Sequence, residues 1–106
     1  MMTVLGLDEN NFYDEVSQGI VLVDFYADWC GPCRRMHPVL QSVSSEVTDA
    51  VIAKVNIDES PNLTSTFKIE GVPSFILFKD GEIVERYVGA IPKQDIFGIL
   101  EKARGA

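Results

Sequence analysis

Apolar residues recur along the chain at two different spacings, which predict strands and helices in turn. Residues 20–27 are almost continuously apolar and β-branched, a pattern typical of a strand that is covered on both faces. In residues 33–47, Met36, Leu40 and Val43 recur at steps of three and four, which indicates one buried face of a helix. The chain therefore combines a central strand with a helix able to pack against it.

The same criteria divide the rest of the chain into strands and helices. We expect strands at 3–5, 20–27, 51–57, 74–79 and 83–88, and helices at 8–18, 33–47, 60–67 and 92–104. The Asp80–Gly81 pair predicts a tight hairpin, so the last two strands must be antiparallel, whereas the early strands, which alternate with helices, should be parallel. The pattern therefore predicts an α/β fold in a single domain over residues 1–106, with a mixed, mostly parallel sheet of about five strands flanked by four helices.

Composition and charge narrow the possible partners. The 106 residues carry nine Lys and Arg against sixteen Asp and Glu, a formal net charge of −7. This balance argues against nucleic-acid or anionic-membrane binding, because phosphate contacts need concentrated positive charge. Residues 1–12 lack the basic and apolar segments of a signal peptide, and no apolar run is long enough to span a bilayer. We therefore expect a cytoplasmic protein that binds neither nucleic acid nor membrane. We also expect a monomer, although neither composition nor charge decides the oligomeric state.

The only two cysteines, Cys30 and Cys33, directly follow the predicted central strand and stand at the start of the next helix. They are too few for a disulfide scaffold, and a single histidine cannot complete a four-ligand zinc site, so we expect neither a metal nor an organic cofactor. Residues three apart on a helix have Cβ atoms about 5–6 Å apart, and a small departure from helical geometry lets such a pair close into a disulfide. This placement predicts a redox-active pair. Two structural cysteines or a partial metal site are the alternative.

The order of residues around the pair predicts different roles for the two sulfurs. Cys30 precedes the helix, so unpaired amide groups of the first turn would stabilise its thiolate. Gly31 supplies backbone freedom, and Pro32 removes an amide that would lack a partner in that turn. We predict that Cys30 attacks a substrate disulfide and that Cys33 resolves the mixed disulfide.

Asp24 interrupts the apolar run of the predicted central strand. A buried carboxylate is costly unless it is protonated, hydrated or paired. Because desolvation would raise its pKa, Asp24 is a candidate proton acceptor near neutral pH. A structural position in a polar pocket is the alternative.

Trp-Cys-Gly-Pro-Cys at residues 29–33, in this order of elements, resembles the thioredoxin family. Matching segments occur over nearly the whole chain, at residues 23–25, 55–58, 71–73, 78–81 and 88–90. The resemblance implies the thioredoxin fold and a protein-disulfide reductase that cycles between dithiol and disulfide. Disulfide-containing client proteins would be its substrates, and a flavoenzyme of the thioredoxin-reductase type would re-reduce it.

The resemblance also implies roles for residues around the cysteines. Asp24 would take the proton of Cys33, and Lys54 would tune this acid; from its residue type alone, Lys54 is more simply a solvated strand lysine. The bond between Val72 and Pro73 would be cis, with the Val72 backbone offering hydrogen bonds to an extended substrate segment. An ordinary trans turn proline is the alternative.

A flat apolar rim around the outer sulfur would suit varied protein partners. The expected substrate-binding residues are Trp29, Gly31, Pro32, Val72, Pro73, Gly89 and Ala90. Two positions depart from the family pattern: Tyr26, where tryptophan is frequent, and His37, where many relatives have a small apolar residue. We hypothesise that His37 perturbs proton transfer to Asp24 between pH 6 and 8; a packed or surface histidine is the alternative.

Two competing functions share these features. One is a disulfide oxidant or isomerase, which the Gly-Pro insert disfavours because the resemblance links that insert to the reducing members of the family. The other is a binding adaptor that uses the fold without its chemistry. An intact cysteine pair, with Asp24 and Pro73 also present, weakens the adaptor hypothesis without excluding it.

Overall fold

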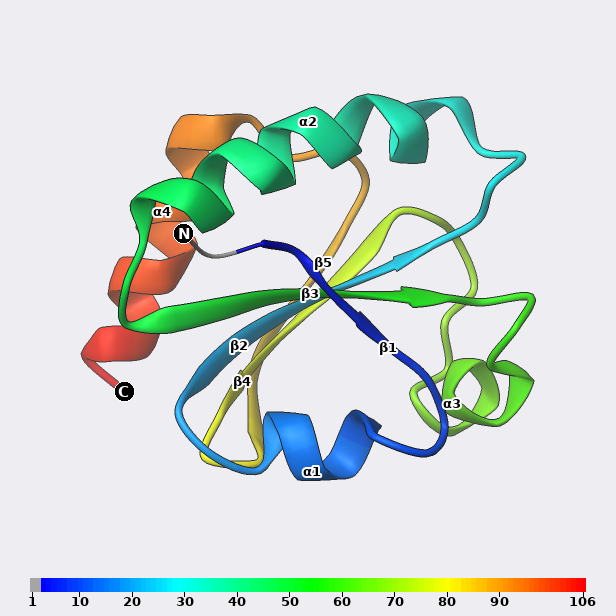
Figure 1. Ribbon diagram of the computed structural model, residues 1–106, viewed down its shortest axis with the longest axis horizontal. Helices are drawn as coiled ribbons and strands as arrows, with labels where there is room; N and C mark the ends of the chain where they lie inside the picture. The colour runs from blue at the N-terminus through cyan, green and yellow to red at the C-terminus, as the bar shows by residue number, and fades with distance from the viewer. Residues whose placement is uncertain (1–2) are drawn as a thin grey trace.

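A computed structural model describes residues 3–106 and shows one mixed sheet between two layers of helices (Figure 1). Among these residues, no helix has the length and apolar character needed to cross a membrane. The elements in chain order are β1 (Leu5–Leu7), α1 (Phe12–Val16), β2 (Ile20–Tyr26), α2 (Gly31–Glu46), β3 (Ala50–Asn56), α3 (Pro61–Thr66), β4 (Ser74–Lys79), β5 (Glu82–Val88) and α4 (Lys93–Arg104).

The five strands are ordered β1-β3-β2-β4-β5, which places β2 at the centre of the sheet. β1 and β2 both pair with β3 in parallel, whereas β4 is antiparallel to β2 and to β5. The expected fold class, with parallel early strands and a final hairpin, is confirmed. At the hairpin, Asp80 and Gly81 have φ values of 51° and 86°, as a two-residue turn with positive φ at both positions requires.

Three differences between the expected and the observed elements exceed one residue, and the other boundaries agree to within one residue. The sequence pattern places the first strand at 3–5, but its pairing with β3 begins at Leu5 and ends at Leu7. Only Phe12–Val16 of the expected helix at 8–18 is helical, because Asp8 and Asn11 form local turns with side-chain oxygens that accept backbone N–H groups. α2 begins at Gly31, two residues earlier than expected.

The sheet has a separate apolar core on each face. α2 and α4 cover one face, and α1 and α3 cover the other (Figure 1). Successive residues of β2 alternate between the two: Leu22 packs under α2 and α4, whereas Val21 and Val23 pack with α1 and α3. Since both faces of β2 are covered, its continuous apolar run is explained, and Asp24 falls on the α2 face in step with Leu22.

The Glu9 side chain joins the loop before α1 to the start of α3. Its carboxylate accepts hydrogen bonds from the backbone N–H of Asn62 (2.6 Å) and Leu63 (3.2 Å) and from the Asn62 side-chain amide (3.0 Å). This distant carboxylate acts as the helix cap, since Ser60 makes no side-chain cap. We expect Glu9→Ala to lower the free energy of unfolding by about 1 kcal/mol in urea denaturation. Glu70→Ala is the control at an exposed carboxylate; an equal loss in both variants would contradict the capping role.

Candidate active site

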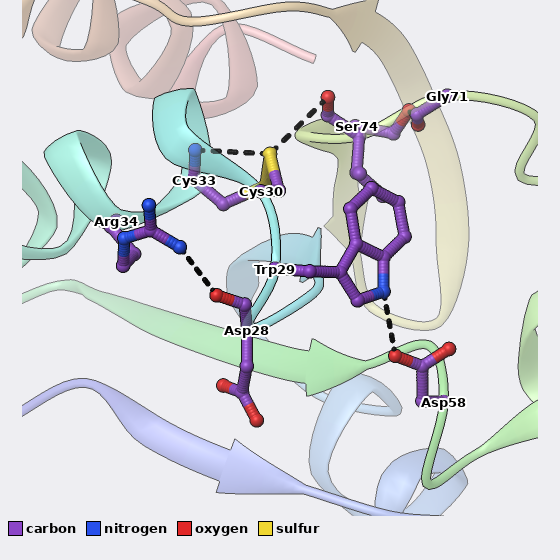
Figure 2. The surroundings of a disulfide bond; sticks show 9 residues. Asp28, Trp29, Cys30, Cys33, Arg34, Asp58, Gly71 and Ser74 are labelled. Carbon is purple, nitrogen blue, oxygen red and sulfur yellow. Dashed lines mark hydrogen bonds between the residues drawn. A yellow bond between two sulfur atoms is a disulfide. The ribbon is translucent and has the colours of Figure 1, made fainter.

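The two cysteines lie where β2 ends and α2 begins, and they form a disulfide (Figure 2). Cys30 is the N-cap of α2, with extended backbone angles (φ −94°, ψ 114°), and Gly31 and Pro32 form the first turn. The Cα atoms of the pair are 5.2 Å apart, which is within the usual range for a disulfide. The predicted pairing of Cys30 with Cys33 is therefore present in the structure.

The two sulfurs differ in exposure and in hydrogen bonding. Cys30 is 6% exposed, whereas Cys33 is 0% exposed. The Cys33 backbone N–H donates to Cys30 Sγ over 3.2 Å, and the helix N-terminus adds partial positive charge at the same sulfur. An incoming sulfur can therefore reach Cys30 before Cys33, and a thiolate at Cys30 has a donor already in place.

A loop from the other side of β2 lies against the outer sulfur. The Val72–Pro73 peptide bond is cis, as the resemblance implies. The Val72 carbonyl oxygen lies 3.7 Å from Cys30 Sγ. The Pro73 carbonyl accepts the Gly89 N–H over 2.8 Å, so the segment that follows β5 is attached to this loop. Four of the expected substrate-binding residues, Val72, Pro73, Gly89 and Ala90, thus meet on the Cys30 side of the site.

Trp29 supplies a large exposed apolar surface next to the disulfide, being 66% exposed. Its indole N–H donates to Asp58 Oδ2 over 3.0 Å (Figure 2). Asp58 is not among the residues predicted from the sequence, although it follows β3 at the carboxyl edge that β3 shares with β2. The sequence did contain a signal for this contact. The indole N–H of Trp29 needs an acceptor, and Asp58 is a carboxylate that follows the next strand along the chain. Val88, 80% exposed at the end of β5, was also missed as an apolar residue near this surface.

Hydrogen bonds fix the short segment between β2 and the disulfide. The Arg34 guanidinium donates to the Asp28 carbonyl oxygen over 2.6 Å (Figure 2). The Asn56 side-chain amide donates to the Asp28 carboxylate over 3.4 Å. Residues of α2 and β3 thereby hold the segment that carries Trp29 and Cys30, and neither Asp28 nor Asn56 was identified from the sequence.

Asp24 lies within the sheet with no exposed surface. Neither carboxylate oxygen has a hydrogen-bond partner among residues 3–106. Burial raises the pKa of Asp24 to about 7, and the positive charge of Lys54 opposes part of that rise. The predicted increase in proton affinity is therefore present, and its cause is desolvation.

Lys54 stands directly opposite Asp24 in the pairing of β2 with β3. Its ammonium group lies 5.7 Å from the centre of the Tyr26 ring. The same ring meets His37, with ring centroids 5.1 Å apart. Lys54 is therefore a partly buried neighbour of the site and not a fully solvated strand residue.

His37 packs against the aromatic ring of Tyr26. Burial, and then the charge of Lys54, lower the pKa of His37, while Asp28 acts in the opposite direction. The net effect is to lower the pKa of His37 below its ordinary value. His37 is therefore placed as a packed histidine, which was the alternative to a role in proton transfer.

A disulfide at a helix N-terminus, with one residue slightly exposed and the other fully buried, is typical of the class of thiol–disulfide oxidoreductases. Comparison with known proteins agrees with this class. The family model described as Thioredoxin matches residues 3–102, and the chain belongs to the thioredoxin family.

Individual relatives match over almost their full length. Thioredoxin of Chlamydia trachomatis serovar D is 41% identical over 96 residues, covering 91% of this chain and 94% of the relative. Thioredoxin of Staphylococcus saprophyticus is 38% identical over 102 residues, covering 95% and 98%. The solved structure of a mutant thioredoxin from Halobacterium salinarum superposes with a TM-score of 0.89 at 38% identity, covering 95% of this chain and 90% of that chain. Sequence and fold thus support the same activity, thiol–disulfide exchange.

Proposed function

We propose that this protein is a protein-disulfide reductase in which Cys30 is the nucleophile and Cys33 the resolving thiol. The observation that carries the proposal is the asymmetry of the pair: Cys30 keeps 6% of its surface exposed and accepts a backbone hydrogen bond, whereas Cys33 is fully buried. This asymmetry suits Cys30 to attack the client disulfide first and Cys33 to resolve the mixed disulfide afterwards.

In the first step, the Cys30 thiolate attacks one sulfur of a client disulfide. A bond forms between Cys30 and the client, the client S–S bond breaks, and the second client sulfur leaves as a thiolate. The Cys33 N–H and the N-terminus of α2 stabilise the Cys30 thiolate before the attack.

In the second step, Asp24 accepts the proton of Cys33, and the Cys33 thiolate attacks Cys30. The Cys30–Cys33 disulfide forms, and the client leaves with both sulfurs reduced, so two electrons have passed to the client. An acceptor for this proton works best with a pKa near the working pH, and burial brings that of Asp24 to about 7. Lys54 moderates the pKa of Asp24 through its positive charge.

Clients bind to the surface around Cys30. Trp29, Gly31 and Pro32 border it on one side, and the loop at Val72 and Pro73 with Gly89 and Ala90 borders it on the other. The Val72 backbone, held beside Cys30 Sγ, is positioned to pair with an extended client segment. A surface of this kind favours proteins over one small substrate.

The hydrogen bond between Trp29 and Asp58 orients this surface. We expect Asp58→Ala to lower kcat/KM for a protein disulfide about two- to fivefold, since one partly exposed hydrogen bond to a charged group is lost. Asp58→Asn keeps an acceptor oxygen and should retain most of the activity. Stopped-flow measurement of Trp29 fluorescence during client reduction provides the rates; equal losses in the two variants would contradict an orienting hydrogen bond.

The wider proposal rests on two supports: family membership for the electron donor, and the acidic composition for the excluded partners. A flavoenzyme of the thioredoxin-reductase type supplies the electrons, the protein acts as a cytoplasmic monomer with one domain, and it binds neither nucleic acid nor membrane. The test is NADPH-dependent reduction of a protein disulfide by such a flavoenzyme, with and without this chain. Catalytic amounts of the chain should be required; reduction that is independent of the chain contradicts the proposal.

Equilibration with glutathione separates a reductase from an oxidant. A difference of about 30 mV in potential changes the free energy of the two-electron exchange by ~1.4 kcal/mol. A reductase must remain largely oxidised in a glutathione buffer that leaves an oxidant reduced. A pull-down with Cys30 and Cys33 both replaced by Ser tests the adaptor alternative, because an adaptor keeps its partner without either sulfur.

A further inference from the structure

The side chains of His37, Tyr26 and Lys54 form a continuous stack that crosses three elements. The His37 ring, on α2, meets the Tyr26 ring, on β2, edge-on: the centroids are 5.1 Å apart and the planes are inclined by 80°. The Lys54 ammonium, on β3, lies 5.7 Å from the centre of the same Tyr26 ring. Both separations fall within the ranges of favourable aromatic and cation–π contacts.

Asp24 lies next to this stack in the sheet, and the charge of Lys54 lowers the pKa of Asp24. Asp24 and Tyr26 are two residues apart on β2, so they project from the same face of the sheet, the face that α2 covers. Lys54 is the direct pairing partner of Asp24 on β3. Among residues 3–106, the ion pairs shorter than 4.0 Å do not include Lys54. The Tyr26 ring is therefore a side chain that the structure places against the ammonium group, whereas no carboxylate lies within ion-pair distance of it among these residues.

We propose that His37 is a positioning residue: its ring holds Tyr26, and Tyr26 in turn holds the Lys54 ammonium group beside the Asp24 carboxyl. The proposal extends the proposed function and rests on it, because it explains what sets the charge next to the proton acceptor. In this role His37 acts through Tyr26 and not on the reacting sulfurs.

The charges that face His37 are consistent with a neutral ring in this position. Lys54, from β3, disfavours the protonated form, as burial also does, and Asp28, from the segment after β2, favours it. A neutral imidazole can lie against Tyr26 without repelling the nearby Lys54 ammonium. The Tyr26 hydroxyl also stays protonated, because burial raises the pKa of Tyr26 above its ordinary value. Lys54 is thus the cation of the stack, and the acid that its charge affects is Asp24.

The experiment is a titration of the Asp24 carboxyl carbon by NMR in the oxidised protein. His37→Ala removes the ring and should increase the proton affinity of Asp24 about threefold, the size expected for releasing one partly exposed cation–π contact. His37→Phe keeps an aromatic ring without a titrating group, and Asp24 should titrate as in the unsubstituted protein. Tyr26→Leu, with His37 intact, should match His37→Ala and serves as an independent variant if that one does not fold.

A background variant shows whether the effect passes through Lys54. Lys54→Met should raise the proton affinity of Asp24 at least as much, and His37→Ala should then add nothing. The proposal is overturned by an unchanged titration in His37→Ala, by a shift that persists with Lys54→Met, or by His37→Phe behaving like His37→Ala. A different measurement tests whether Asp24 is the proton acceptor. If it is not, Asp24→Asn resolves the mixed disulfide at the normal rate. That outcome would contradict the proposed function but would leave the titrations, and the positioning role of His37, unaffected.

Discussion

Cys33→Ser, mixed in its reduced form with a disulfide-containing client, is expected to accumulate a covalent adduct through Cys30, whereas Cys30→Ser is expected to be inert. With Ser at 33, the first exchange still forms the mixed disulfide, but no second thiol is present to release it. Turnover should fall to background in both variants. Non-reducing electrophoresis with mass spectrometry of the adduct detects the difference.

The roles depend on the different surroundings of the two sulfurs, so a second measurement checks them directly. In the reduced protein, iodoacetamide near pH 7 should modify Cys30 much faster than Cys33, because Cys30 keeps some exposed surface and Cys33 has none. An adduct through Cys33 in Cys30→Ser, or equal alkylation of both sites at the rate of a free amino-acid thiol, would overturn the assignment. A denatured sample is the control for equal reactivity.

The stability of the folded protein is expected to fall by about 4 kcal/mol between roughly pH 4 and pH 8 because of Asp24 alone. The carboxyl of the unfolded chain ionises near its ordinary pKa of 3.8, whereas the folded one ionises at about 7. Between these values the folded state binds more protons, so the contribution is fully present below pH 3.8 and is lost progressively as the pH rises through about 7. Each pKa unit corresponds to about 1.36 kcal/mol, which sets the size of the effect.

Asp24→Asn isolates this contribution. The Asn side chain carries its own burial cost, but that cost does not depend on pH. The difference in unfolding free energy between Asp24→Asn and the unsubstituted oxidised protein should therefore move in favour of the variant as the pH rises through the pKa of Asp24 at about 7. Urea denaturation at several pH values measures it. Glu70→Gln, at an exposed carboxyl, is the matched control, and parallel curves for all three proteins would show that the acid is not buried as described.

Local sequence was sufficient for the features that depend on neighbours along the chain. The apolar run of β2, the helical repeat of α2 and the Asp80–Gly81 turn predicted the elements, since each pattern reflects a backbone geometry a few residues long. The spacing of Cys30 and Cys33 at a strand-to-helix junction predicted the redox pair for the same reason. The resemblance added the cis bond before Pro73, which no local pattern reveals.

Contacts between distant segments lay beyond such reasoning. The antiparallel direction of β4 against β2, the cap that Glu9 supplies to α3 and the acceptor that Asp58 supplies to Trp29 each join residues far apart in the chain. The sequence could indicate that a carboxylate in β2 needed explanation. Only the packed sheet showed that Asp24 has no hydrogen-bond partner among residues 3–106, and that Lys54 pairs opposite it.

Short-range patterns thus predicted the pair of sulfurs and the order of strands and helices, because spacing and side-chain type are enough to predict both. The proton affinity of Asp24 and the stack of His37, Tyr26 and Lys54 arose from folding, because burial and the distance between charges exist only once separate elements have come together.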